Sequence, residues 1–280
     1  MTTESKQKQK QNVFVRHPLG SFFVLSYLFF LIAILIIWAV TSLVSVSDFG
    51  MGLLIAFGSW TPNLAAVIIT GLTGGKREIR TLFAGWMKWR VSPWLYLFGF
   101  APILTAFLSA GLYSLIGNVS VPEPTNDLTT SSILLMIFLH TIQGATGEEL
   151  GWRGFALPNL QKRFNSLTSA IILGLVISGW HGILHLASPT GIPEWQFVLL
   201  LVSYSILITW AYNTSRGSVW IATLFHFAFN FSLDLVSARL GLIPLENLFA
   251  MRTAIYTALA VILTLITGKS LSKKSISSNK

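Results

Sequence analysis

Long apolar runs alternate along the chain with short polar stretches that hold most of its charged residues. An α-helix of about 20 apolar residues crosses the hydrocarbon core of a bilayer. The pattern therefore predicts an all-α fold, a polytopic transmembrane helix bundle of about eight spans. We expect the spans near residues 20–46, 51–73, 93–117, 131 onward into GEELGWRGF, 168–187, 196–212, 219–236 and 251–267.

The same pattern divides the chain into four parts. We expect a polar N-terminal tail at 1–19, a three-span region at 20–130, a core at 131–237, and a last span with a basic tail at 238–280. The first apolar run is longer than the apolar region of a cleaved signal peptide, and no small-residue cleavage site follows it. We therefore expect an uncleaved first helix.

Composition supports a membrane protein, because 53% of the residues are hydrophobic and only 10% are charged. Soluble domains carry about 25% charged residues. The chain has no cysteine, which removes disulfides, thiolate metal ligands and a cysteine nucleophile. The net charge of +9 would fit nucleic acid, but the bases lie between the apolar runs, as membrane topology requires. We expect the lipid bilayer, and no nucleic acid, as a partner.

The distribution of bases also predicts orientation. With eight spans and both termini in the cytoplasm, only Arg239 and Arg252 of the 19 Lys and Arg residues fall outside. A seven-span arrangement would place either the N-terminal or the C-terminal bases outside. The positive-inside rule therefore favours eight spans with cytoplasmic termini.

Glu148 and Glu149 stand side by side where the fourth span ends. Adjacent residues on a helix point about 100° apart, so the two carboxylates can have different roles. Arg153 lies four residues after Glu149 and shares its face, which leaves Glu148 freer to accept and later donate a proton. The plain alternative is a surface ion pair at a cytoplasmic helix end; the flanking Trp152 and Phe155 argue against it.

Two later spans carry further polar pairs with the same spacing. His181 and His185 can present two metal ligands, or they can be core histidines bonded to backbone or water. His226 and Asn230 can hold a carbonyl oxygen or an oxyanion through the Asn amide, or they can join helices by hydrogen bonds. Ionisable groups in membrane spans are costly and mark functional sites. Three such pairs together predict one polar pocket inside the bundle.

In this order, the motifs resemble those of the CAAX prenyl protease and bacteriocin-processing family, the type II CAAX endopeptidase-like intramembrane proteases (Abi family). The first motif, Glu-Glu-x-x-x-Arg, is matched by Glu148, Glu149 and Arg153 within EELGWRGFALPNLQKRF. The third, His-x-x-x-Asn, is matched by His226 and Asn230. The resemblance covers residues 131–237, which would form the catalytic core, and no motif matches the first three spans.

The second motif of the family is a histidine in the span after the Glu pair, often with Phe or Trp four residues before it. The residue four positions before His181 is Ile177, and the residue four positions before His185 is His181. Trp180 directly precedes His181, and the lead-in SAIILGLVISGWH fits the family up to its histidine. We therefore assign His181 to the motif and keep His185 as an additional candidate.

The resemblance implies hydrolysis of a peptide bond in a membrane cavity open to the cytosol. Glu148 would be the general base that activates water, and His181 would hold or share that water. His226 and Asn230 would stabilise the oxyanion.

The remaining motif residues, Glu149 and Arg153, would orient the site. Two or three histidines and a glutamate can also hold a divalent metal such as zinc, so the question of a metalloprotease stays open. The substrate would be a peptide or protein that carries a lipid in some relatives. That substrate would be the C-terminus of a prenylated protein, or a peptide in bacteriocin processing and self-immunity. The resemblance also implies that the protein lies in a bacterial plasma membrane.

Other classes of function fit the same polar residues. Intramembrane Glu, His and Arg also form proton relays in ion-coupled transporters, although the chain shows no internal repeat. A pair of histidines from two spans can hold haem or metal in an electron carrier. A catalytically silent relative would act as a membrane immunity or binding protein.

Overall fold

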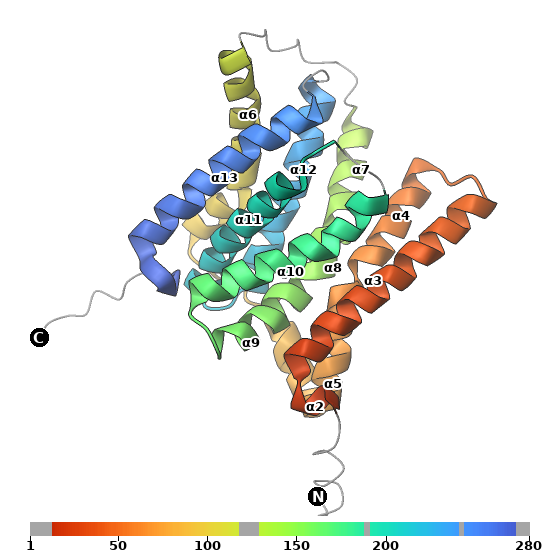
Figure 1. Cartoon of the computed structure of the whole chain (residues 1–280), viewed down its shortest axis with the longest axis vertical. Coiled ribbons are helices and arrows are strands. Elements are labelled where there is room, and N and C mark those ends of the chain that lie inside the picture. Colours follow the sequence, from red (N-terminus) through yellow and green to blue (C-terminus); the bar gives the residue numbers. More distant parts are fainter. Residues whose placement is uncertain (1–12, 118–128, 188–190, 241–243, 273–280) are drawn as a thin grey trace, which may run out of the picture.

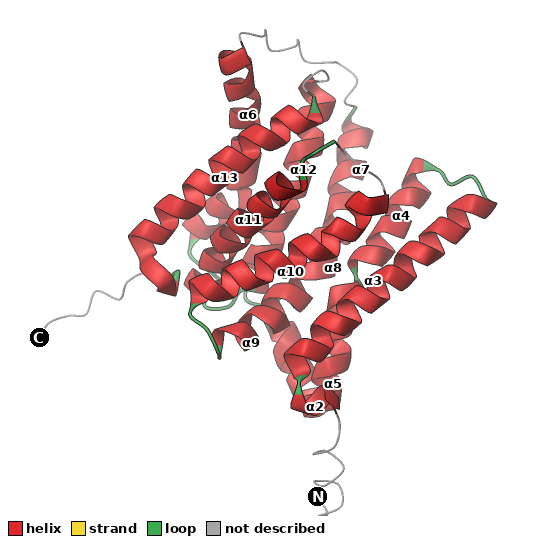
Figure 2. Ribbon diagram, viewed as in Figure 1, coloured by secondary structure: helices red, strands yellow, loops and turns green. Residues whose placement is uncertain are grey.

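The computed structural model describes residues 13–117, 129–187, 191–240 and 244–272. Every regular element in these segments is a helix (Figure 2). The basic N-terminal and C-terminal tails and the polar loop at 118–128 lie outside the described residues. The fold class predicted from the apolar runs, a helical membrane bundle, is confirmed.

Seven helices of the described part are long and apolar enough to cross a membrane, when α4 and α5 are taken as one. Their ends fall close to the predicted spans. The bounds are α3 Pro18–Leu43, α4 Asp48–Ser59, α5 Thr61–Ala84, α6 Pro93–Gly117, α10 Ser166–Ala187, α11 Glu194–Thr214, α12 Val219–Leu240 and α13 Leu245–Thr267, after a first turn, α2 Val13–Arg16.

The outside of the bundle is apolar. Leu35 on α3, Leu104 on α6 and Leu265 on α13 are each more than half exposed. Many other large apolar side chains are exposed as well. A continuous apolar surface of this kind indicates contact with lipid rather than water. The chain is therefore a multi-pass membrane protein.

The second span is longer than the sequence pattern predicted. Residues 74–84, expected as a polar connection, continue α5 through a kink at Gly75, whose φ is +69°. Glycine adopts this backbone conformation without the steric cost of a side chain. Lys76, Arg77 and Arg80 follow the kink with exposed side chains, and such residues are good helix formers.

The predicted fourth span is helical but broken, which is why seven long helices stand where eight were expected. It comprises α7 Thr130–His140, the π-helix η1 Thr141–Ala145, α8 Thr146–Glu149, the π-helix η2 Leu150–Ala156 and α9 Leu157–Gln161. In Figure 1 this stretch runs from α7 at the upper end of the bundle, past α8, to α9 near the lower end. π-Turns inside α-helices are frequent at functional sites.

Asn63 of α5 ties the broken helix to its neighbour. Its amide nitrogen donates to the Thr146 carbonyl at 2.7 Å, and its amide oxygen accepts from the Gly151 amide at 2.9 Å. π-Segments displace backbone groups from the regular helical ladder, and buried backbone groups need partners. Asn63 therefore supplies a donor and an acceptor where the helix does not.

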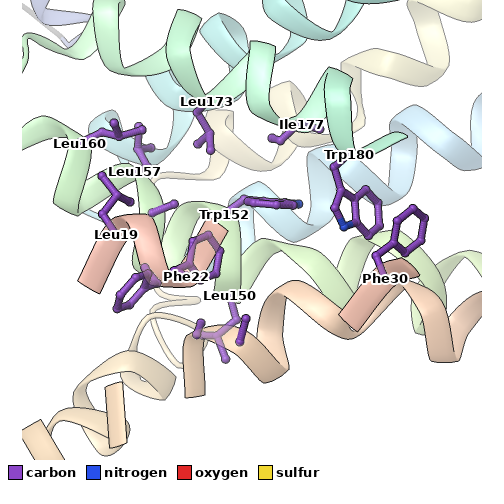
Figure 3. Close-up of a cluster of buried hydrophobic side chains, with 14 of the residues drawn as sticks. Leu19, Phe22, Phe30, Leu150, Trp152, Leu157, Leu160, Leu173, Ile177 and Trp180 are labelled. Carbon is purple, nitrogen blue, oxygen red and sulfur yellow. The ribbon is translucent and has the colours of Figure 1, made fainter. Parts of the chain in front are cut away.

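An aromatic cluster packs α3 against η2 and α10 (Figure 3). Phe22 meets Trp152 edge to face at 5.5 Å between ring centroids, and Phe30 stacks on Trp180 at 3.8 Å. Trp152 and Trp180 also contact each other, 6.0 Å apart. Both indoles are fully buried. The cluster therefore fixes Trp152, which lies beside Glu148, and Trp180, which directly precedes His181.

Candidate functional site

The polar residues singled out in the sequence gather where α8 and η2 meet α12. Glu149 and Arg153 are both 0% exposed, and Glu148 is 3% exposed. They lie inside the bundle rather than at its surface. The alternative of a surface ion pair at a helix end is therefore wrong.

Glu149 accepts two hydrogen bonds on the same carboxylate oxygen. Arg153 Nη1 donates to its Oε1 at 3.2 Å, as the spacing of four predicted. His226 Nδ1 lies 2.7 Å from the same oxygen and donates to it, because a carboxylate only accepts. The guanidinium of Arg153 also lies over the Tyr204 ring, 5.4 Å from its centroid. Charge, hydrogen bonds and stacking thus hold the imidazole of His226 in one orientation.

Glu148 is held differently. Its Oε2 accepts from the indole Nε1 of Trp152 at 3.1 Å. It has no ion pair among the described residues. One carboxylate oxygen is thus fixed by a neutral donor, and the other, Oε1, points toward Gly144 of η1.

Three polar atoms converge beside Gly144. A Cβ atom placed on this glycine would lie 2.9 Å from His226 Nε2 and 3.0 Å from both Asn230 Nδ2 and Glu148 Oε1. Atoms that share such a point lie within about 6 Å of one another, a span that one water can bridge with two hydrogen bonds. The structure therefore brings the base candidate together with His226 and Asn230, the two motif residues of α12.

His181 approaches from α10. Its Nδ1 donates to the Ile177 carbonyl at 3.0 Å, and its ring lies edge to face against Trp180, at 4.8 Å between centroids. It lines a cavity of about 130 Å³ together with Glu148, Arg153, His226 and Asn230, among others.

His185 lies on α10, but its side chain is outside the described residues. Asp234 and His140, which the motifs do not include, pair at 2.9 Å between α12 and α7.

Arg252 of α13 lines the same cavity, and the motifs did not identify it. It is 1% exposed, donates to the Phe229 carbonyl and to Ser232 Oγ, and lies over the Phe229 ring at 3.8 Å. The topology had placed this arginine on the outer side as an exception to the positive-inside rule. That exception could have identified Arg252 from the sequence, because an arginine that does not follow the positive-inside rule is a candidate for burial inside the protein.

The same donor set bears on the question of a metal. No group of three or more His, Cys, Asp or Glu side chains in the described residues is arranged to hold an ion. Glu149 Oε1 and His226 Nδ1 already bond to each other. Glu148 Oε1 and His226 Nε2 lie together beside Gly144. Zinc sites use three or four protein ligands, so a zinc ion here would need a further ligand such as His181, which lines the same cavity.

The bundle and its buried cluster of Glu, Arg and His side chains define a polytopic membrane protein with a polar site between its helices. Residues 130–232 match the family model described as type II CAAX prenyl endopeptidase Rce1-like. The chain is also similar to a protein named CAAX prenyl protease 2 from Methanococcus maripaludis, with 29% identity over 130 residues. That similarity covers 43% of this chain and 48% of the relative, so it spans about half of the relative's length.

The family resemblance inferred from the motifs is thereby confirmed, and residues 130–232 match the model of the Rce1-like type II CAAX prenyl endopeptidases. All the motif residues of the candidate site lie inside this range. Asn63 and Arg252, which contact or line the site from α5 and α13, lie outside it.

Proposed function

We propose that this protein is an intramembrane endopeptidase that hydrolyses a peptide bond with water activated by Glu148. The observation that carries the proposal is the convergence of Glu148 Oε1, His226 Nε2 and Asn230 Nδ2 beside Gly144. It occurs within a domain whose relatives are named as prenyl proteases. A carboxylate, an imidazole and an amide around one small space form a set that suits addition of water to a carbonyl.

Glu148 has the properties that a general base requires. The Trp152 indole holds one oxygen at 3.1 Å and leaves the other directed at the shared space. In the proposed step, Glu148 takes a proton from water while the water oxygen bonds to the carbonyl carbon. His181 lines the same cavity from α10 and shares the water. General acid–base catalysis of this kind contributes about 10²–10⁴-fold to a rate.

Asn230 and His226 stabilise the oxyanion that forms as the carbonyl electrons move to oxygen. The Asn amide offers two hydrogens, and donors fixed before the reaction stabilise developing charge without reorganisation. Glu149 and Arg153 act through His226, because their contacts hold its ring. The resulting amine leaves with the proton that Glu148 accepted, and the acid product carries the oxygen of the water.

The substrate proposed is a peptide or protein segment that reaches the cavity from the membrane or its surface. The relative's name indicates a prenylated substrate for that protein. We propose a lipidated C-terminal segment as the first substrate to test here, with unlipidated peptides, including bacteriocin precursors, as comparison.

The direct test uses purified full-length protein in lipid nanodiscs with a quenched fluorescent peptide library, each peptide with and without a prenylated cysteine. We expect cleavage by the wild type and a loss of at least about 100-fold in kcat for Glu148→Gln, which keeps an acceptor for Trp152. Glu194→Gln, an exposed acid at the start of α11, is the matched control and should cleave normally.

A comparison of C-terminal and membrane-protein fragments in cells with wild-type or Glu148→Ala protein would identify natural substrates. Full activity of the Glu148 variants would remove this residue from the role of base. A wild type that binds peptides but cleaves none would instead indicate a membrane binding or immunity protein.

A further inference from the structure

Gly144 lies at the point where the fourth span is most irregular. It is buried in η1, directly after Gln143, whose ψ of −151° departs from helical geometry. The kink turns the chain so that the bare Cα of Gly144 faces α12. His226 and Asn230 of α12 and Glu148 of the following turn all pack against this position.

The packing around Gly144 is so close that a methyl group there would require the neighbouring side-chain ends to shift. A methyl carbon there would lie 2.9–3.0 Å from three polar atoms, whereas carbon normally keeps a contact distance of about 3.5 Å. Two of the three atoms belong to side chains that hydrogen bonds hold in place. Trp152 holds Glu148, and Glu149 holds His226. Rotation of Glu148 or His226 away from the methyl group would disturb the hydrogen bond that orients it, and rotation of Asn230 would move its amide away from the other two atoms.

We propose that Gly144 is a positioning residue whose lack of a side chain lets Glu148, His226 and Asn230 share one water molecule, the water that attacks the peptide bond. This inference rests on the proposed function and adds a residue and a bound nucleophile to it. Gly144 touches no reacting atom and acts through the three side chains.

The polarity of the three atoms identifies the shared molecule as water rather than the substrate carbonyl. A carboxylate oxygen only accepts, and an Asn amide nitrogen only donates. Water donates to Glu148 Oε1 and accepts from Asn230 Nδ2, and it complements His226 Nε2 as either donor or acceptor. A carbonyl oxygen can only accept, so it would be repelled by Glu148.

The reaction follows from this arrangement. The O–H bond that points to Glu148 breaks and its proton moves to Oε1, while the water oxygen bonds to the carbonyl carbon. The π-electrons of the carbonyl move to its oxygen, and Asn230 and His226, which held the water before the bond formed, then stabilise that oxyanion. The hydrogen bonds that hold the water thus also point its proton at the base.

The test is Gly144→Ala in the full-length protein, with Gly111→Ala as the matched control. Gly111 lies inside α6, and a Cβ there would meet no other atom within 4 Å. We expect kcat of Gly144→Ala to fall by at least about 100-fold, the scale of general base catalysis, with KM changed less than threefold. Gly111→Ala should keep wild-type kcat. A Gly144→Ala variant with kcat within threefold of wild type would overturn the proposal.

Peptide affinity separates positioning from a purely structural role. In the inactive Glu148→Gln background, Gly144→Ala should leave the Kd of a fluorescent peptide within twofold. A large loss of affinity would overturn the proposal, because Gly144 would then serve folding or substrate binding.

A high-resolution experimental structure of the wild type provides a test that needs no variant and no cleavage assay. One water within hydrogen-bond distance of Glu148 Oε1, His226 Nε2 and Asn230 Nδ2 is expected. Absence of a shared water at high resolution would contradict the inference. A wild type that cleaves no peptide but holds this water would refute the proposed function alone. Cleavage that Gly144→Ala leaves intact would refute this inference alone.

Discussion

Replacement of Arg153 by methionine removes the cation from a fully buried ion pair. Arg153 Nη1 lies 3.2 Å from Glu149 Oε1, and both side chains have almost no exposed surface. At this separation the attraction is about 5 kcal/mol for an effective dielectric constant of about 20. Removal of one partner leaves a buried charge that has lost its compensation, which costs about 3–5 kcal/mol in comparable cases. We therefore expect Arg153→Met to lower the free energy of unfolding by about that amount.

The measurement is equilibrium unfolding in mixed detergent micelles, followed by tryptophan fluorescence. Lys162→Met is the control, because Lys162 is exposed directly after the same helical stretch and surface substitutions change stability by about 0.5 kcal/mol or less. The double variant Glu149→Gln/Arg153→Met should recover much of the stability but not the activity, because His226 loses its anionic acceptor. A loss below about 1 kcal/mol for Arg153→Met would refute the assignment of a buried, compensated pair.

Two further predictions concern Asn63 and metal dependence. Asn63→Leu leaves the Thr146 carbonyl and the Gly151 amide without their partner, so we expect a loss of about 2–4 kcal/mol in unfolding free energy. kcat should also fall, because η2 carries Arg153. An unchanged free energy of unfolding would contradict the proposed role of Asn63 in holding the broken helix. For metal dependence, we expect kcat in nanodiscs to stay within twofold after treatment with a chelator, because the proposed base and oxyanion donors are side chains of the protein. Loss of activity that zinc restores, while manganese and magnesium do not, would show that the site works as a metal centre.

Several features of the fold and site could be predicted from the sequence because they are local. Apolar runs of about 20 residues located the spans, and spacings of four placed Glu149 with Arg153 and His226 with Asn230 on shared helical faces. The Glu149–Arg153 pair is confirmed at 3.2 Å. These inferences need only the helical repeat, which every residue in a helix obeys.

Features that depend on contacts between distant segments could not be predicted in the same way. The role of Asn63 arises from partners more than 80 residues away, and nothing in its own span marks it. The π-segments η1 and η2 depend on which backbone groups pair with each other, which the residue pattern does not show, so a regular span was expected. Arg252 was visible only as an exception to the charge rule, and its place beside the cavity follows from the packing of α13.

In the proposed mechanism, Glu148 activates the water that cleaves a peptide bond. The most direct measurement compares kcat of wild type, Glu148→Gln and Glu194→Gln on one cleaved peptide in water enriched with ¹⁸O. We predict one ¹⁸O atom in the new C-terminal carboxylate for wild type and Glu194→Gln, and a loss of at least about 100-fold in product for Glu148→Gln. Labelled product formed by Glu148→Gln at the wild-type rate would contradict the account.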